Sequence, residues 1–316
     1  MATARRNSRW TRSTPLGARK RAQLSAHDIE IFTVLARYRY LPADYIHAIA
    51  GGSFKYLTER LGVLSREPNL FVVRPQQQRE NAAANHRPLI YELDQRGIRV
   101  LQERGVSVQR PRAPANFAHE LMACQIMASF ELGARERGAR VITWPDILSS
   151  RNLPDATRRS PRPFHIPVRF EGNDFHIAAD AHPFGIERSI AGERSHYFCP
   201  GIEADCGTEP VDASDFARSS IYKKFVLYLA VEAQDIHRSH FGFPNFYVPI
   251  ITTNEVRARS MMELLTRITG GSGSRIFLFK TFPALTSFDK ASPPSGRMLT
   301  EDWQRVSYPP FNFLTS

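Results

Sequence analysis

Three acids and a pair of lysines in the second half of the chain have the types and spacing of a site that binds a hard divalent cation. The acids are Asp180, Glu203 and Asp205, and the lysines are Lys223 and Lys224. Mg²⁺ prefers oxygen ligands and keeps several of its waters, so carboxylates on neighbouring strands can hold it against a phosphate. The ion then lowers the pKa of a bound water and neutralises charge on the phosphate. The sequence therefore predicts a Mg²⁺ site with Asp180, Glu203 and Asp205 as metal ligands.

The excess positive charge of the chain lies entirely in its first third. Residues 1–112 contain 20 Lys and Arg against 9 Asp and Glu, whereas residues 113–316 contain 22 of each. The first 27 residues contain seven Lys and Arg and no Asp or Glu. A module with this balance attracts polyanions. Together with the acidic cluster, it indicates a protein that binds DNA and that could cleave it.

The basic first third has the element order of a winged helix-turn-helix. Ser25 to Asp28 resembles a helix-starting capping box, Gly51-Gly52 interrupts the helical pattern, and Ser53 can cap a third helix. In that third helix Phe54, Leu57, Leu61 and Leu64 fall on one face. Two strand-like runs, 70–74 and 89–93, then flank a polar loop, and a helix over 96–104 follows. In this arrangement the third helix enters the major groove and the loop is the wing.

The side chains expected to contact DNA lie on the third helix and the wing. They are Lys55, Thr58, Arg60, Arg74, Arg79 and Arg87. The competing interpretation is a small helical domain whose Lys and Arg side chains are only solvated. The charge, the basic arm and the element order together favour DNA binding.

The rest of the chain alternates helices and strands. We expect a long helix over 117–137, a strand over 139–144, a hairpin over 164–179, a polar loop over 185–195, a strand over 197–204, a helix over 212–235, strands over 246–252 and 275–282, and a helix over 255–268. The apolar residues expected to form the core are Leu121, Phe130, Ile221, Phe225 and Leu229. The expected organisation is a basic arm (1–23), a winged helix-turn-helix (24–110), a mixed-sheet domain (117–283) and a surface-wrapping tail (284–316).

The fold class expected is thus α/β (α+β), and the second domain resembles the restriction-endonuclease-like PD-(D/E)xK fold. The chain as a whole, over about residues 24–282, resembles the replication-relaxation family of plasmids, phages and integrative elements. The motifs that carry this resemblance are His119-Glu120-Leu121, Ala179-Asp180-Ala181, the run from Ile202 to Glu209, and the run from Tyr222 to Tyr228. The resemblance implies a DNA-binding protein of a mobile element that acts in replication, DNA relaxation or transfer.

The chain departs from the nuclease pattern at one position. In active nucleases of this fold a lysine follows the second acid by two residues, and here Asp205 stands in that place. Lys224 is the best candidate to have taken over the lysine's role, with Lys223 second. Glu120 is a further acid that could approach the cluster. Asp155 follows a proline, as the fold's name requires, but it lies in a Pro/Arg/Ser-rich loop, so we reject it.

Two function hypotheses follow. The first is a Mg²⁺-dependent DNA endonuclease that uses Asp180, Glu203, Asp205 and Lys224. The second is a non-catalytic transcriptional regulator or accessory factor with a degenerate nuclease-like domain. The chain lacks the Gly-rich loop of P-loop ATPases and the Gly-x-Ser-x-Gly elbow of hydrolases. Its three cysteines and the lack of any membrane-length apolar run favour a reduced, cytoplasmic protein. The expected partner is double-stranded DNA, with a homodimer as an open alternative.

Overall fold

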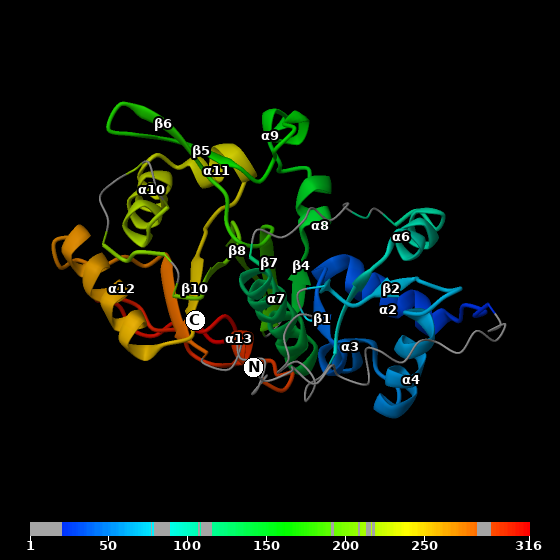
Figure 1. Ribbon diagram of the computed structural model, residues 1–316. Coiled ribbons are helices and arrows are strands. Elements are labelled where there is room, and N and C mark those ends of the chain that lie inside the picture. The colour runs from blue at the N-terminus through cyan, green and yellow to red at the C-terminus, as the bar shows by residue number, and fades with distance from the viewer. Residues whose placement is uncertain are drawn as a thin grey trace, which may run out of the picture. The chain divides into compact units, whose positions relative to one another are not determined.

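The protein is a mixed α/β chain whose residues divide into two compact units, as the computed structural model shows (Figure 1). The N-terminal unit comprises Met1–Ala128 and Thr286–Pro294, and the C-terminal unit comprises Ser129–Leu285 and Ser295–Ser316. Within the described residues, no helix is long and apolar enough to cross a membrane. The structure describes residues 21–76, 78, 89–106, 108, 116–190, 193–207, 209–212, 216, 219–282 and 292–316.

The N-terminal unit contains short helices and a small antiparallel sheet in which the strand order is β1-β3-β2. Its elements are α2 (Ala26–Tyr38), β1 (Leu41–Pro42), α3 (Ala43–Ala50), α4 (Phe54–Leu64), β2 (Val72–Val73), β3 (Ile90–Leu93) and α6 (Gln95–Gln102). The expected helices and the two expected strands are all present. Strand β1 was not expected, because two residues are too few to produce an alternating pattern.

Local capping explains where α2 and α4 begin. Ser25 and Asp28 form the predicted capping box of α2, and the Ser53 side chain caps α4. The apolar face of α4 is buried through Leu57, Leu61 and Leu64. Phe54, predicted on the same face, is instead 44 % exposed, because it stands in the first turn, before the helix meets the core.

The C-terminal unit is built on a parallel sheet with the strand order β11-β10-β9. Helix α12 packs against β10, β11 and α10, and a second sheet has the order β4-β7-β8. Helix α7 (Phe117–Arg137) crosses the boundary between the units in sequence. The other elements are β4 (Arg140–Ile142), α8 (Trp144–Ser149), α9 (Asp155–Arg159), β5 (Ile166–Phe170), β6 (Asn173–Ile177), β7 (Phe184–Ile190), β8 (Glu193–Cys199), β9 (Glu203–Asp205), α10 (Ile221–Ala233), α11 (Ile236–Phe241), β10 (Val248–Thr252), α12 (Glu255–Ile268), β11 (Phe277–Thr281) and α13 (Arg297–Thr300).

Some expectations for this unit were wrong. The region 185–195 is not a polar loop but most of the antiparallel hairpin β7–β8. Its charged residues, such as Glu187 and Arg188, are only partly buried, so they do not prevent strand pairing. The helix expected over 212–235 begins only at Ile221, where the Ser220 side chain caps it.

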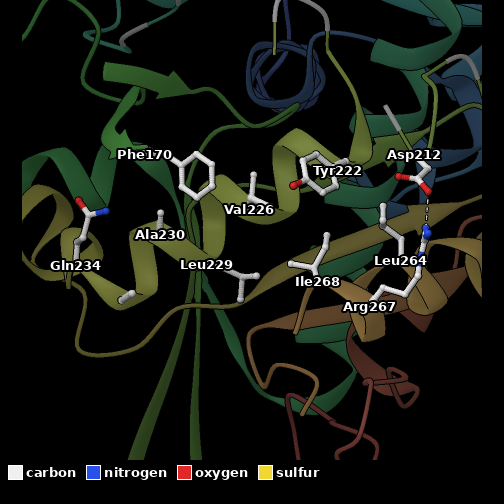
Figure 2. Close-up of a pocket in the computed structure, with 11 residues that line it drawn as sticks. Phe170, Asp212, Tyr222, Val226, Leu229, Ala230, Gln234, Leu264, Arg267 and Ile268 are labelled. Carbon is white, nitrogen blue, oxygen red and sulfur yellow. Dashed lines mark hydrogen bonds and ion pairs between the residues drawn. The ribbon is translucent and has the colours of Figure 1, made fainter. Parts of the chain in front are cut away.

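Most of the predicted core residues are buried, but they do not all belong to one core. Phe130, Ile221 and Phe225 are buried in the C-terminal unit. Leu121 packs instead with Tyr40 and neighbouring residues of the N-terminal unit. Leu229 is half-buried and lines an open groove of about 700 Å³ between α10 and α12, whose lining residues Figure 2 shows in close-up.

The C-terminal segment does not simply wrap the surface, as its sequence had indicated. Trp303, Phe311 and Phe313 are buried, and Trp303 stacks on Phe130 with ring centroids 6.0 Å apart. The segment also adds an antiparallel bridge from Gln304 to β11. It is therefore part of the core of the C-terminal unit.

Candidate active site

The candidate site lies at β9, which is the edge strand of the parallel sheet. The segment that follows the β5–β6 hairpin runs beside β9: the Asp180 amide donates to the Ile202 carbonyl, and the Asp180 carboxylate accepts from the Ala204 amide, both at 2.9 Å. Gly201 makes this approach possible, because a Cβ there would lie 2.4 Å from Ala179. Asp180 is thereby held next to Glu203.

Lys224 joins these acids from the first turn of α10. Its ammonium nitrogen lies 2.8 Å from Glu203 Oε2 and 3.9 Å from Asp180 Oδ2. It also lies 3.0 Å from Glu209 Oε2. On the next turn of α10, the Tyr228 hydroxyl donates to Glu203 Oε1 at 2.7 Å. The structure thus brings together Asp180, Glu203 and Lys224, as the sequence predicted.

Asp205 has different partners from Asp180 and Glu203. The Arg257 guanidinium, from the start of α12, binds both of its carboxylate oxygens. The Thr252 hydroxyl donates to the same carboxylate at 2.8 Å. Because Arg257 donates to both carboxylate oxygens, we assign Asp205 to a structural ion pair. This corrects the expectation that Asp205 is a metal ligand.

Glu209 is the site residue that the sequence analysis missed. Besides contacting Lys224, its carboxylate accepts a hydrogen bond of 2.8 Å from the Ser219 hydroxyl, and its carbonyl accepts one from Arg257. It lies only four residues after Asp205, in the last position of the motif from Ile202 to Glu209. That position was the one signal that pointed to it.

The cluster carries more negative charge than Lys224 can neutralise. Burial, with a smaller contribution from the Asp180 carboxylate, raises the pKa of Glu203 to about 7 against the opposing attraction of the Lys224 ammonium. A divalent cation would relieve this excess, so Asp180 and Glu203 fit a Mg²⁺ ion that needs one or two carboxylates. A set of three does not form: across the described ranges, no group of three or more His, Cys, Asp or Glu is placed to hold a metal ion.

The raised pKa of Glu203 predicts how stability depends on pH. A carboxyl group whose pKa in the folded protein exceeds its ordinary value of 4.5 makes the fold less stable as pH rises from below 4.5 through about 7. Glu203→Gln removes that loss. We therefore expect the melting temperature of this variant, relative to the wild type, to increase between pH 5 and pH 8. A difference that is flat with pH, or that falls, would contradict the assigned environment of Glu203.

The predicted DNA-binding residues fall into three groups. Lys55 is exposed on α4, and Thr58 is half-buried with its hydroxyl bonded to the Lys55 carbonyl. Arg60 and Arg74 have protein partners: Arg60 binds the buried Asp28 carboxylate at 2.7 Å, and Arg74 lies 3.4 Å from the Gln78 amide oxygen. Arg79 and Arg87 lie outside the described residues, as does the basic arm up to residue 20.

The remaining acids of the sequence analysis have other partners. Glu120 forms an ion pair with Arg39 inside the N-terminal unit. Asp155, rejected above, is 77 % exposed in α9 and lies near Arg158 and Arg159. No known protein family, curated protein or solved structure matches the chain. The functional argument therefore rests on the geometry of the cluster and on the charge of the N-terminal unit.

Proposed function

We propose that the chain is a DNA-binding protein of a mobile genetic element, in which a winged helix-turn-helix binds the duplex and a nuclease-like domain carries a Mg²⁺-dependent phosphodiester site. The winged-helix assignment is supported by the order of α2, α3, α4, β2 and β3 and by the excess of Lys and Arg in residues 1–112. The assignment to a mobile element, and to its replication or transfer, comes from the resemblance described above.

One observation carries the catalytic part of the proposal. The Lys224 ammonium is in contact with Glu203 and close to Asp180, although Lys224 lies on a helix rather than on the strand that carries Glu203. Two acids and a lysine around one point is the combination that this chemistry requires. In this proposal Lys224 takes the role of the lysine that nucleases of this fold carry at the position of Asp205.

The residues of the cluster would have separate roles. Asp180 and Glu203 would hold the cation, which supplies an acidified water and neutralises charge on the phosphate. The Lys224 ammonium can orient the attacking water or bind a phosphate oxygen. Tyr228 holds the Glu203 carboxylate in place through its hydroxyl. Arg257 fixes the end of β9 and the Glu209 carbonyl, and so positions the loop that follows the strand.

The test combines metal binding and cleavage in the full chain. We expect millimolar Mg²⁺ or Mn²⁺ to raise the melting temperature, because a ligand of the native state opposes unfolding by mass action. The same ions should support nicking of supercoiled plasmid. Asp180→Asn should abolish both effects and leave duplex affinity within about twofold. Asp155→Asn is the matched control and should change nothing. Nicking that persists in Asp180→Asn would refute the site.

The second candidate function is a non-catalytic regulator or accessory factor. The observation that favours it is that the Lys224 ammonium already occupies the centre of the carboxylate cluster, where a cation would have to enter. In this alternative the ion pairs only stabilise the fold. Duplex binding without any metal-induced thermal shift and without nicking would decide for it.

A further inference from the structure

The C-terminal unit also contains a polar pocket that is separate from the cluster around Lys224. It has a volume of about 680 Å³ and is bounded by α9, α11 and the β5–β6 hairpin, which lie side by side in Figure 1. Its polar lining is unusual because it contains cationic or donor groups and no acid. These groups are Arg162, His165, His176, His240 and the hydroxyls of Thr157, Ser160 and Ser239. Such a lining suits an anion.

Arg162 is the strongest cation of this pocket. Its side chain is exposed, and its guanidinium has no hydrogen-bond or ion-pair partner among the residues that the structure describes. The backbone around it is held by two turns: the Arg162 amide donates to the Ser160 hydroxyl, and the His165 amide donates to the Arg162 carbonyl, both at 3.1 Å. A fixed backbone thus presents a guanidinium that no residue in the described part of the chain engages.

The hydrogen bonds of His240 also indicate positive charge. Its Nε2–H donates to the Pro163 carbonyl at 2.9 Å. The Thr157 hydroxyl donates its one proton to the His240 carbonyl at 2.5 Å and lies 3.2 Å from Nδ1. Nδ1 can therefore bond to that oxygen only as a donor, and the network is complete when the ring carries both protons.

Without an anion, the pocket opposes that charge. Burial lowers the pKa of His240, although the Pro163 carbonyl raises it, and His176 lowers it further. The acid of α9, Asp155, lies near Arg158 and Arg159 and so balances other cations. The remaining charged side chains on the elements packed around His240 are Arg169, Glu171 and Asp174 of the hairpin, Asp235, His237 and Arg238 at α11, and Lys223, Lys224 and Glu232 of α10.

We propose that this pocket binds a phosphate group of a nucleic-acid backbone through Arg162 and His176, beside the His240 ring. Two observations favour a polyanion over a small free anion. Residues 151–169 contain five arginines and one acid, although residues 113–316 have no net charge. The pocket is also close to the candidate active site in sequence, because His176 precedes Asp180 by four residues. Four extended residues span at most ~14 Å, and DNA carries a phosphate every ~3.4 Å of axis along each strand.

The choice of nucleic acid rests on the proposed function, but the anion site does not. The first arm of the test therefore titrates the full chain with inorganic phosphate alone and monitors binding by NMR of the imidazole C–H signals. We expect signals of His176 and His240 to shift with millimolar saturation in the wild type. The shifts should be lost in Arg162→Ala, retained in Arg162→Lys, and unchanged in the control Arg194→Ala, which removes an exposed arginine of β8. No saturable shift in the wild type would overturn the anion site.

The second arm uses duplex DNA and the dependence of affinity on salt. Each phosphate contact contributes about −0.9 to the slope of log K against log salt. We expect Arg162→Ala combined with His176→Ala to make the slope less negative by about one, and Arg194→Ala to leave it unchanged. If phosphate binds but the slope does not change, the ligand is a free phosphate and the backbone assignment is wrong. Neither arm measures metal binding or nicking, so failure here is distinguishable from failure of the active site.

Discussion

Replacing Lys224 by alanine is expected to destabilise the C-terminal unit by about 3–5 kcal/mol at pH 8 and to abolish nicking. The destabilisation follows because the buried Glu203 carboxylate loses its cation, and an uncompensated buried charge costs about that much. At pH 5.5 the cost should be smaller, because Glu203, with its pKa raised to about 7, can take up a proton instead. Urea unfolding followed by circular dichroism at both pH values measures the difference.

The neighbouring lysine provides the matched control for this experiment. The Lys223 ammonium donates to the Phe216 carbonyl and lies over the Phe175 ring, 5.4 Å from its centroid. Lys223→Ala should therefore cost less than Lys224→Ala and should leave the pH dependence unchanged. Mg²⁺ should raise the melting temperature of Lys224→Ala more than that of the wild type, since the ion can take the place of the ammonium. Equal losses of unfolding free energy in the two variants would mean that Lys224 does not compensate a buried carboxylate.

The residues of the candidate site that follow a local sequence pattern could be predicted. Asp180 was recognised because it follows an alternating run, and Glu203 because it ends a strand-like run. Lys224 was recognised because the resemblance required a lysine and the nearest helix supplied one. The partner of Asp205 could not be found in this way, because Arg257 is 52 residues away in sequence. Ion pairs between distant elements leave no periodic signal.

The fold shows the same division between local and distant causes. The starts of α2 and α4 could be read from capping residues and apolar spacing, because these act within one turn, whereas α10 begins at Ile221 and not at residue 212 as expected. Hairpin β7–β8 was missed, since its strands are stabilised by each other and by a sheet that only the folded chain creates. The C-terminal segment was misjudged for a related reason: its aromatic residues have no regular spacing, and their burial depends on a helix that is far away in sequence.

That segment gives the second large effect that we expect. Trp303→Ala should cost about 3–5 kcal/mol, the usual range for removing a buried aromatic side chain. Trp303 is fully buried, its indole N–H donates to the Met298 carbonyl at 3.0 Å, and the Lys280 ammonium lies 4.6 Å from its ring centroid. The loss would thus remove packing, a hydrogen bond and a cation–π contact together.

The control for Trp303 comes from the same segment. Tyr308 is 42 % exposed, so Tyr308→Ala should change the free energy of unfolding by no more than about 0.5 kcal/mol. Trp303→Phe should fall between the two, because it keeps most of the stacking on Phe130 but not the hydrogen bond. Urea titrations of the three variants in the full chain compare these costs directly. If Trp303→Ala proved as mild as Tyr308→Ala, the segment would be a surface tail after all, and the core around Phe130 would have to be closed by other residues.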